Sequence, residues 1–114
     1  MTPGKYNMIC PQGATFTKRL TWTIEDVPVD LTGYTGRMQA KVSYSNKCQP
    51  IFTITTENGG ILVDDEGNID LLISSDDTEI FIPKEYIYDL ELEKNNTVYR
   101  ILEGKFIVTP EVTK

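Results

Sequence analysis

Apolar and polar residues alternate along several short stretches of this chain, which is the pattern of half-buried β-strands. In residues 15–24, Phe16 and Trp22 share one parity, while the other parity is mostly threonine. Lys18 falls on the apolar parity. Either its apolar stem extends along a sheet margin so that the charged amine reaches water, or the strand bulges there. We predict a strand over 15–24.

The same alternation predicts a second long strand over residues 34–44, with Tyr34, Met38 and Tyr44 on its apolar side. Between these two strands, residues 25–33 are predicted to form a connection. The shorter predicted strands cover residues 6–10, 52–55, 61–63, 69–73, 86–92, 98–102 and 106–109.

Turn residues separate these strands. Asn58-Gly59-Gly60 predicts a tight turn, because paired glycines accept positive φ without steric cost. Glu103-Gly104 predicts a bulge or bend. Residues 74–83 show the one helical signal: Ser75 is placed to cap a single turn before Pro83 ends it.

Composition supports an all-β fold. The 114 residues include 14 Thr, 12 Ile and 7 Val but only 2 Ala, and β-branched residues favour strands over helices. We therefore predict a single domain over residues 1–114, an antiparallel β-sandwich of immunoglobulin-like type with seven to nine strands. An up-and-down or partly open barrel is the alternative.

The net charge and the residue types that are absent or rare exclude several classes of function. The chain has no histidine, which excludes histidine-based triads and metal sites, and its net charge of −6 disfavours binding to nucleic acid. The acidic residues concentrate in 57–93, as a solvated face or as one side of a charge-matched assembly.

No apolar run approaches the ~20 residues of a membrane span. Cys10 and Cys48 are expected to be free thiols of a protein that folds in a reducing cytoplasm, since the amino terminus lacks a signal-peptide pattern.

One acidic loop is a weak candidate for a cation site. Its candidate ligands are Asp64, Glu66, Asn68 and Asp70, oxygen donors of the kind that Ca²⁺ accepts around a glycine. Their spacing departs from that of a calcium-binding EF-hand loop, and predicted strands flank them. A simple hairpin turn is therefore the favoured interpretation, and no metal or other cofactor is expected.

Other side chains that could carry chemistry have structural explanations. The carboxylate pairs Asp76-Asp77 and Glu91/Glu93 point to opposite faces or to a solvated one, so no catalytic residue is assigned. Among the aromatic residues, strand parity directs Trp22, Tyr34, Tyr44, Tyr86 and Tyr88 inward and leaves Tyr6 and Tyr99 as the more exposed rings.

Several motifs occur together in a fixed order. Gly13-Ala14-Thr15-Phe16 opens one strand, Asp30-Leu31-Thr32-Gly33 precedes another, and Asn58-Gly59-Gly60 and the terminal Val108-Thr109-Pro110-Glu111-Val112-Thr113 follow. In this order the chain resembles small virion proteins of tailed bacteriophages, and it is similar to the amino-terminal immunoglobulin-like domain of phage baseplate upper proteins.

The resemblance implies a non-enzymatic structural protein of the tail, neck, baseplate or fibre attachment. It would be assembled in the host bacterial cytoplasm and would dock onto other virion proteins, with a homo-oligomer possible. The alternative is a free-standing module that binds a glycan or a receptor and therefore needs exposed aromatic rings. An enzyme would have to depend on carboxylates or on a thiol.

Overall fold

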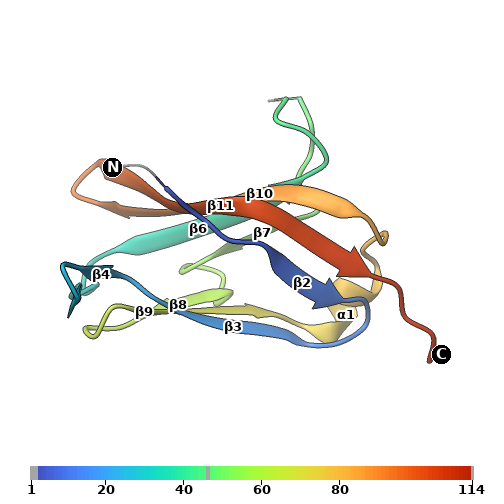
Figure 1. The fold of residues 1–114 in the computed structure, drawn as a ribbon, viewed down its shortest axis with the longest axis horizontal. Coiled ribbons are helices and arrows are strands. Elements are labelled where there is room, and N and C mark those ends of the chain that lie inside the picture. The colour runs from blue at the N-terminus through green and yellow to red at the C-terminus, as the bar shows by residue number, and fades with distance from the viewer. Residues whose placement is uncertain (1–2, 46, 114) are drawn as a thin grey trace.

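The computed structural model describes residues 3–45 and 47–113, and within them the chain is mostly β-structure with one short helix. Eleven strands occur in these residues, three of them only two residues long, against the seven to nine expected. Most of the strands form two layers that lie face to face, and the helix lies at one end (Figure 1). The prediction of an all-β chain with at most one short helical segment is confirmed.

The larger layer is a six-stranded sheet built around β11. Its order is β1, β11, β10, β6, β7, and β2 also pairs with β11. Both β1 and β2 run parallel to β11, so the sheet is mixed rather than purely antiparallel as predicted. The strands are β1 (Gly4–Lys5), β2 (Met8–Pro11), β6 (Thr35–Lys41), β7 (Phe52–Thr55), β10 (Glu85–Lys94) and β11 (Thr97–Thr109).

Strand β11 is continuous through the position where a bend was predicted. Its ladder with β10 slips instead at Ile101, which has no Cα partner there. The role of Gly104 is steric, because a Cβ at this position would lie 2.2 Å from the backbone oxygen of Tyr6. Glycine therefore lets the segment between β1 and β2 pass close to β11, where Tyr6 N donates to the oxygen of Glu103 at 3.0 Å.

The smaller layer has three antiparallel strands in the order β3 (Phe16–Thr21), β9 (Asn68–Ile73) and β8 (Ile61–Val63). The β3–β9 register has no shift, so Lys18 does not mark a bulge. Its side chain reaches the margin of the sheet, with Nζ 5.0 Å from the centre of the Tyr6 ring. This is the first of the two outcomes expected for Lys18.

A small hairpin occupies part of the predicted connection over residues 25–33. Strands β4 (Thr23–Ile24) and β5 (Val27–Pro28) pair across a turn in which Glu25 and Asp26 have φ of 52° and 66°. Two successive positive φ values match the twist of a two-residue hairpin. Neither residue is glycine, so this hairpin lacks the usual glycine signal in its sequence.

The core lies between the two main layers. Phe16 and Ile69 contribute from the smaller sheet, and Met38, Leu90 and Phe106 from the larger one; each is at most 6% exposed. Burying a side chain of this size stabilises a fold by about 1.5–3 kcal/mol. The predicted alternation therefore identifies the inward face of most strands.

The helix α1 (Ser75–Glu79) closes one end of the space between the layers (Figure 1). Its N-cap is Ser74, one residue before the predicted cap, and the Ser74 hydroxyl accepts from Asp77 N. Thr78 is fully buried: its hydroxyl donates to the oxygen of Ala14 at 2.8 Å and accepts from Gly13 N at 3.1 Å. Thr78 thus fixes α1 to the turn between β2 and β3.

Strand β6 is shorter than the predicted strand over residues 34–44. It ends at Lys41, and the apolar parity continues beyond the point where the sheet ends. Val42 has the same parity as Tyr44, and the two side chains are 50% and 88% exposed. The inward orientation predicted for this parity is therefore wrong at both positions. The chain leaves the sheet here as a projecting loop.

Candidate docking surfaces

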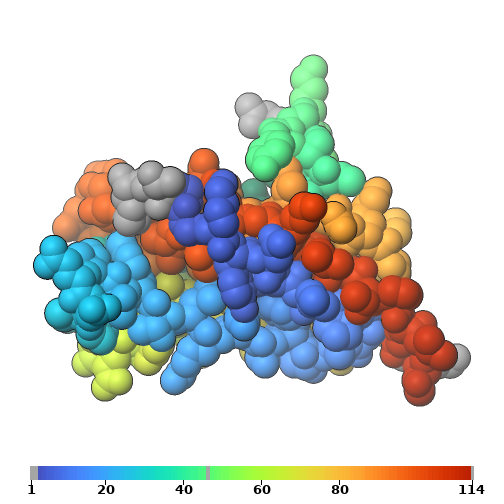
Figure 2. All heavy atoms as spheres, in the orientation of Figure 1, coloured from blue at the N-terminus to red at the C-terminus, as the bar shows by residue number. Residues whose placement is uncertain are grey.

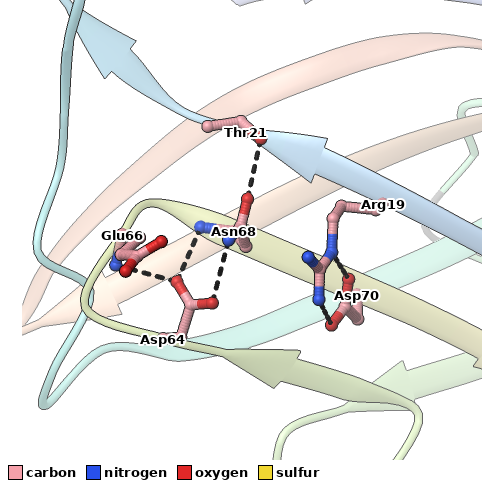
Figure 3. Close-up of polar contacts among 6 residues, drawn as sticks. All are labelled: Arg19, Thr21, Asp64, Glu66, Asn68 and Asp70. Carbon is pink, nitrogen blue, oxygen red and sulfur yellow. Dashed lines mark hydrogen bonds and ion pairs between the residues drawn. The ribbon is translucent and has the colours of Figure 1, made fainter.

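The acidic loop between β8 and β9 is organised by the carboxylate of Asp64 (Figure 3). Oδ1 accepts from the backbone N–H groups of Glu66 at 2.8 Å and Asn68 at 2.9 Å, and Oδ2 accepts from the Asn68 side chain at 3.0 Å. These hydrogen bonds, with the Asn68 side chain foremost, hold the pKa of Asp64 below its ordinary value. Asp64 stabilises a turn, as the favoured interpretation expected.

The other candidate cation ligands have different contacts. Asp70 accepts two hydrogen bonds from Arg19 on β3, at 2.7 Å and 2.9 Å, and this guanidinium lowers the pKa of Asp70 (Figure 3). Asn68 accepts with its side-chain oxygen from the hydroxyl of Thr21. The described residues contain no group of three or more acidic or cysteine side chains placed to hold a metal ion.

The carboxylate pairs Asp76-Asp77 and Glu91/Glu93 lie at exposed or partly exposed positions. Asp76 and Asp77 are both exposed in the first turn of α1, where their charge favours the helix start. Glu91 and Glu93 lie on the outer face of β10, and Glu91 is 3.7 Å from Arg100 on the neighbouring strand. Asp76 and Asp77 thus have a favourable charge at the helix start, and Glu91 has an ion-pair partner.

Two of the predicted inward tyrosines are buried as expected. Tyr86 and Tyr88 are 3% and 4% exposed. The Tyr86 hydroxyl donates to the oxygen of Ile82, and that of Tyr88 donates to the oxygen of Tyr6, both at 2.6 Å. Burial raises the pKa of both phenols, so they stay protonated and act as structural donors.

A second aromatic group lies near the hairpin end of the molecule. Trp22, Tyr34 and Tyr99 are half-buried and pack against one another, with ring centres 5.8–6.3 Å apart. Tyr99 is therefore less exposed than predicted, while Tyr6 is 37% exposed. The three rings meet edge-on or tilted and are not stacked face to face.

The loop between β6 and β7 projects from the larger sheet as a knob (Figure 2). It carries Val42, Tyr44, Lys47 and the half-exposed Cys48. Backbone hydrogen bonds, first from Ser43, lower the pKa of the Cys48 thiol. Tyr44, which is 88% exposed, is the large aromatic ring that this knob presents to solvent.

The two cysteines are free thiols, as expected. Cys10 is fully buried in β2, and burial raises the pKa of its thiol to about 11. A buried thiol that stays protonated at neutral pH is a poor nucleophile. Cys10 is thus a core residue.

Aliphatic side chains are exposed at both ends of the long axis. The β4–β5 hairpin and the start of β11 lie at one end, where Ile24, Val27 and Val98 are 52–64% exposed. Helix α1 lies at the other end, and just beyond it Ile80 and Ile82 are 78% and 71% exposed (Figure 1). These two surfaces are the candidate docking ends of the molecule.

Sequence reasoning did not find these ends. In the sequence, Ile24 continues the apolar parity of Phe16 and Trp22, but the strand ends at Thr21 and Ile24 belongs to the hairpin. Ile80 and Ile82 flank the buried Phe81, and this alternation was hidden by the helical signal that precedes it. The sequence signal for this exposed surface is the run of three apolar residues, Ile80-Phe81-Ile82, just before Pro83.

Across residues 3–45 and 47–113, no helix is both long enough and apolar enough to span a membrane. No protein-family model matches this chain, and no curated protein sequence matches it.

Proposed function

We propose that this chain is a non-enzymatic structural protein of a tailed phage particle, at the tail, neck, baseplate or fibre attachment. It would act there as one immunoglobulin-like β-sandwich that docks onto other virion proteins. The observation that carries the proposal is the exposure of aliphatic side chains at both ends of the long axis, at Ile24, Val27 and Val98 and at Ile80 and Ile82. A rigid unit with an apolar surface at each end is suited to stand between two neighbours.

The turn motifs behind the resemblance add support. Gly33 has φ of 86°, and Thr32 N donates to the side chain of Asp30, so the Asp-Leu-Thr-Gly motif forms a tight turn before β6. Asn58-Gly59-Gly60 also forms a turn, with φ of 83° at Gly59. These motifs set the places where the chain reverses, which a shared fold would preserve.

Docking in this proposal depends on rigid loops and buried apolar contact. Stable interfaces bury roughly 1,200–2,000 Å² in total, with an apolar centre and a polar rim. At the helix end, Ile80 and Ile82 would form such a centre, with the nearby acids Asp76 and Asp77 at the rim. Basic partner surfaces would match that rim.

The test begins with particles purified from a lysate of the phage whose genome encodes the chain. Mass spectrometry should detect the chain in these particles, and electron microscopy should show both apolar ends buried against neighbouring proteins. Absence of the chain from the purified particles would remove the proposal.

A mutational arm tests the docking ends directly. Replacement of Ile80 and Ile82 by aspartate in the encoded gene should leave the isolated protein folded, because both side chains are exposed, but should reduce its incorporation into particles. Val42→Asp, another exposed apolar position but away from both ends, is the matched control. Equal incorporation of both variants would count against docking at this end.

A further inference from the structure

Strand β7 forms one edge of the larger sheet. Within the described residues it pairs with β6 on one side only. On its other side, the side chain of Asn58 takes the place of a neighbouring strand. Thr55 N donates to Asn58 Oδ1 at 2.9 Å, and Asn58 Nδ2 donates to the backbone oxygen of Thr53 at 3.0 Å.

This pair of bonds has the geometry of a strand ladder. A carboxamide offers one acceptor and donors in a plane, as a peptide unit does. Its two bonds reach the residues on either side of Ile54, which is the pattern by which one residue of a parallel strand pairs with its neighbour. The Asn58 side chain therefore imitates a single residue of an added strand.

The turn that follows β7 holds this side chain in place. Asn58 N donates to the hydroxyl of Thr55 at 3.0 Å, and Gly60 N donates to Asn58 Oδ1 at 2.9 Å. A Cβ at Gly60 would lie 2.5 Å from Cβ of Ile54, so glycine is needed for the turn to lie against β7. The position of the carboxamide is thus fixed from both sides.

Apart from its short length of four residues, β7 lacks the usual protections of an open edge. Proteins usually block open edges with charges, proline, bulges or very short strands. β2 ends at Pro11, and β3 contains Lys18 and Arg19. β8 has only three residues. β7 has neither charge nor proline in its sequence Phe-Thr-Ile-Thr.

The neutral edge also suits a second copy of the same chain. The net charge of −6 makes two copies repel over most of their surfaces, but β7 aligned with β7 brings no like charges into register. Beside this edge lies a groove of about 600 Å³ with a mixed lining. Its apolar side chains include Phe52, Ile54, Leu72 and Ile80, and its polar ones include Thr53, Ser75 and Asp77. Apolar side chains from the second copy would enter it.

We propose that Asn58 closes the open edge of β7, and that two copies of the chain pair along β7 when this carboxamide is removed. The inference is independent of the virion role, because it concerns the isolated protein.

The first experiment compares the wild type with Asn58→Ala by hydrogen exchange and sedimentation. In dilute protein, the amide of Thr55 should exchange about tenfold faster in Asn58→Ala, because it loses its acceptor. As the concentration rises, this variant should form a species of twice the wild-type mass, with β7 amides protected again. Glu57→Ala, in the same turn, keeps both bonds of Asn58 and should behave as the wild type.

A double variant separates strand pairing from misfolding. Adding Thr53→Lys to Asn58→Ala places a positive charge on the edge that would face its own copy, so the double variant should return to the wild-type mass. If Asn58→Ala associates because it unfolds, the added lysine will not reverse the association, and the proposal fails. It also fails if Thr55 exchange is unchanged in Asn58→Ala, or if that variant keeps the wild-type mass at all concentrations.

Discussion

The ring of Phe106 in β11 meets the ring of Phe16 in β3 edge to face, with ring centres 5.4 Å apart. This contact joins the two main sheets directly, since each residue belongs to a different layer. Phe106 also meets Phe52 on β7 at 4.9 Å and is fully buried. It is the aromatic residue around which the core is packed.

Phe106→Ala should therefore destabilise the protein by about 3–5 kcal/mol, the range for loss of a buried aromatic ring. Urea unfolding followed by tryptophan fluorescence would measure the loss. Phe106→Leu fills more of the space and should cost clearly less. An alanine variant as stable as the wild type would contradict the packing of the two sheets described here.

Trp22→Ala should cost less, about 2 kcal/mol, because Trp22 is only half-buried and loses mainly its contacts with Tyr34 and Tyr99. Since the variant lacks the one tryptophan of the chain, its unfolding is best followed by circular dichroism. Tyr44→Ala, which removes an exposed ring, is the control and should be nearly neutral. Equal effects at the two positions would show that the Trp22 cluster adds nothing to stability.

Thr78→Val should destabilise the protein by about 1–3 kcal/mol, because it removes a buried hydroxyl and leaves Gly13 N and the Ala14 oxygen without a partner. Thermal unfolding would measure this. Thr97→Val at an exposed position is the matched control. If the two variants unfold at the same temperature, the anchoring of α1 by Thr78 is not important for stability.

Gly104→Ala should loosen the amino-terminal segment, because a methyl group would overlap the backbone oxygen of Tyr6. The expected cost is about 1–3 kcal/mol. Limited proteolysis should cut near Tyr6 faster than in the wild type. Tyr88→Phe removes the hydroxyl that donates to the same oxygen and should shift cleavage in the same direction. Unchanged cleavage in both variants would refute this account of the segment.

Stability should decrease in acid as Asp64 and Asp70 become protonated. Hydrogen bonds from Asn68 and Arg19 hold their pKa values below the ordinary value of about 3.9. Groups with lowered pKa values stabilise the fold above that pH, and this stabilisation is lost as the pH falls through the folded-state values. Urea unfolding from pH 6 to pH 2 should show a smaller decrease in Asp64→Asn and Asp70→Asn than in the wild type. Parallel curves for all three proteins would contradict this assignment.

Local pattern was enough to predict several elements with their bounds. Residues 52–55 and 61–63 form strands as expected, because alternation and the Asn-Gly-Gly turn between them agree. The sequence pattern could not show where a strand loses its neighbour: parity continues to Tyr44, but the sheet ends at Lys41. Side-chain alternation describes one strand and carries no information on the length of its partner.

Two other features were beyond local reasoning. The hairpin at Glu25 and Asp26 depends on positive φ at residues that rarely adopt it. Gly104 is explained only by Tyr6, almost a hundred residues away in sequence. Of the candidate sites, the turn role of Asp64 followed from its sequence, whereas the edge position of Asn58 required the strand pairing.

The parallel pairing of β2 with β11 has a consequence for synthesis of the protein. Met8 lies beside Phe106, so β2 has no partner until β11 has emerged from the ribosome. During translation the nascent β2 is an unpaired, partly apolar segment that chaperones can recognise. Closure of the larger sheet is therefore a late event in folding. Pauses in translation before β11 should prolong the time during which the nascent chain is prone to aggregate.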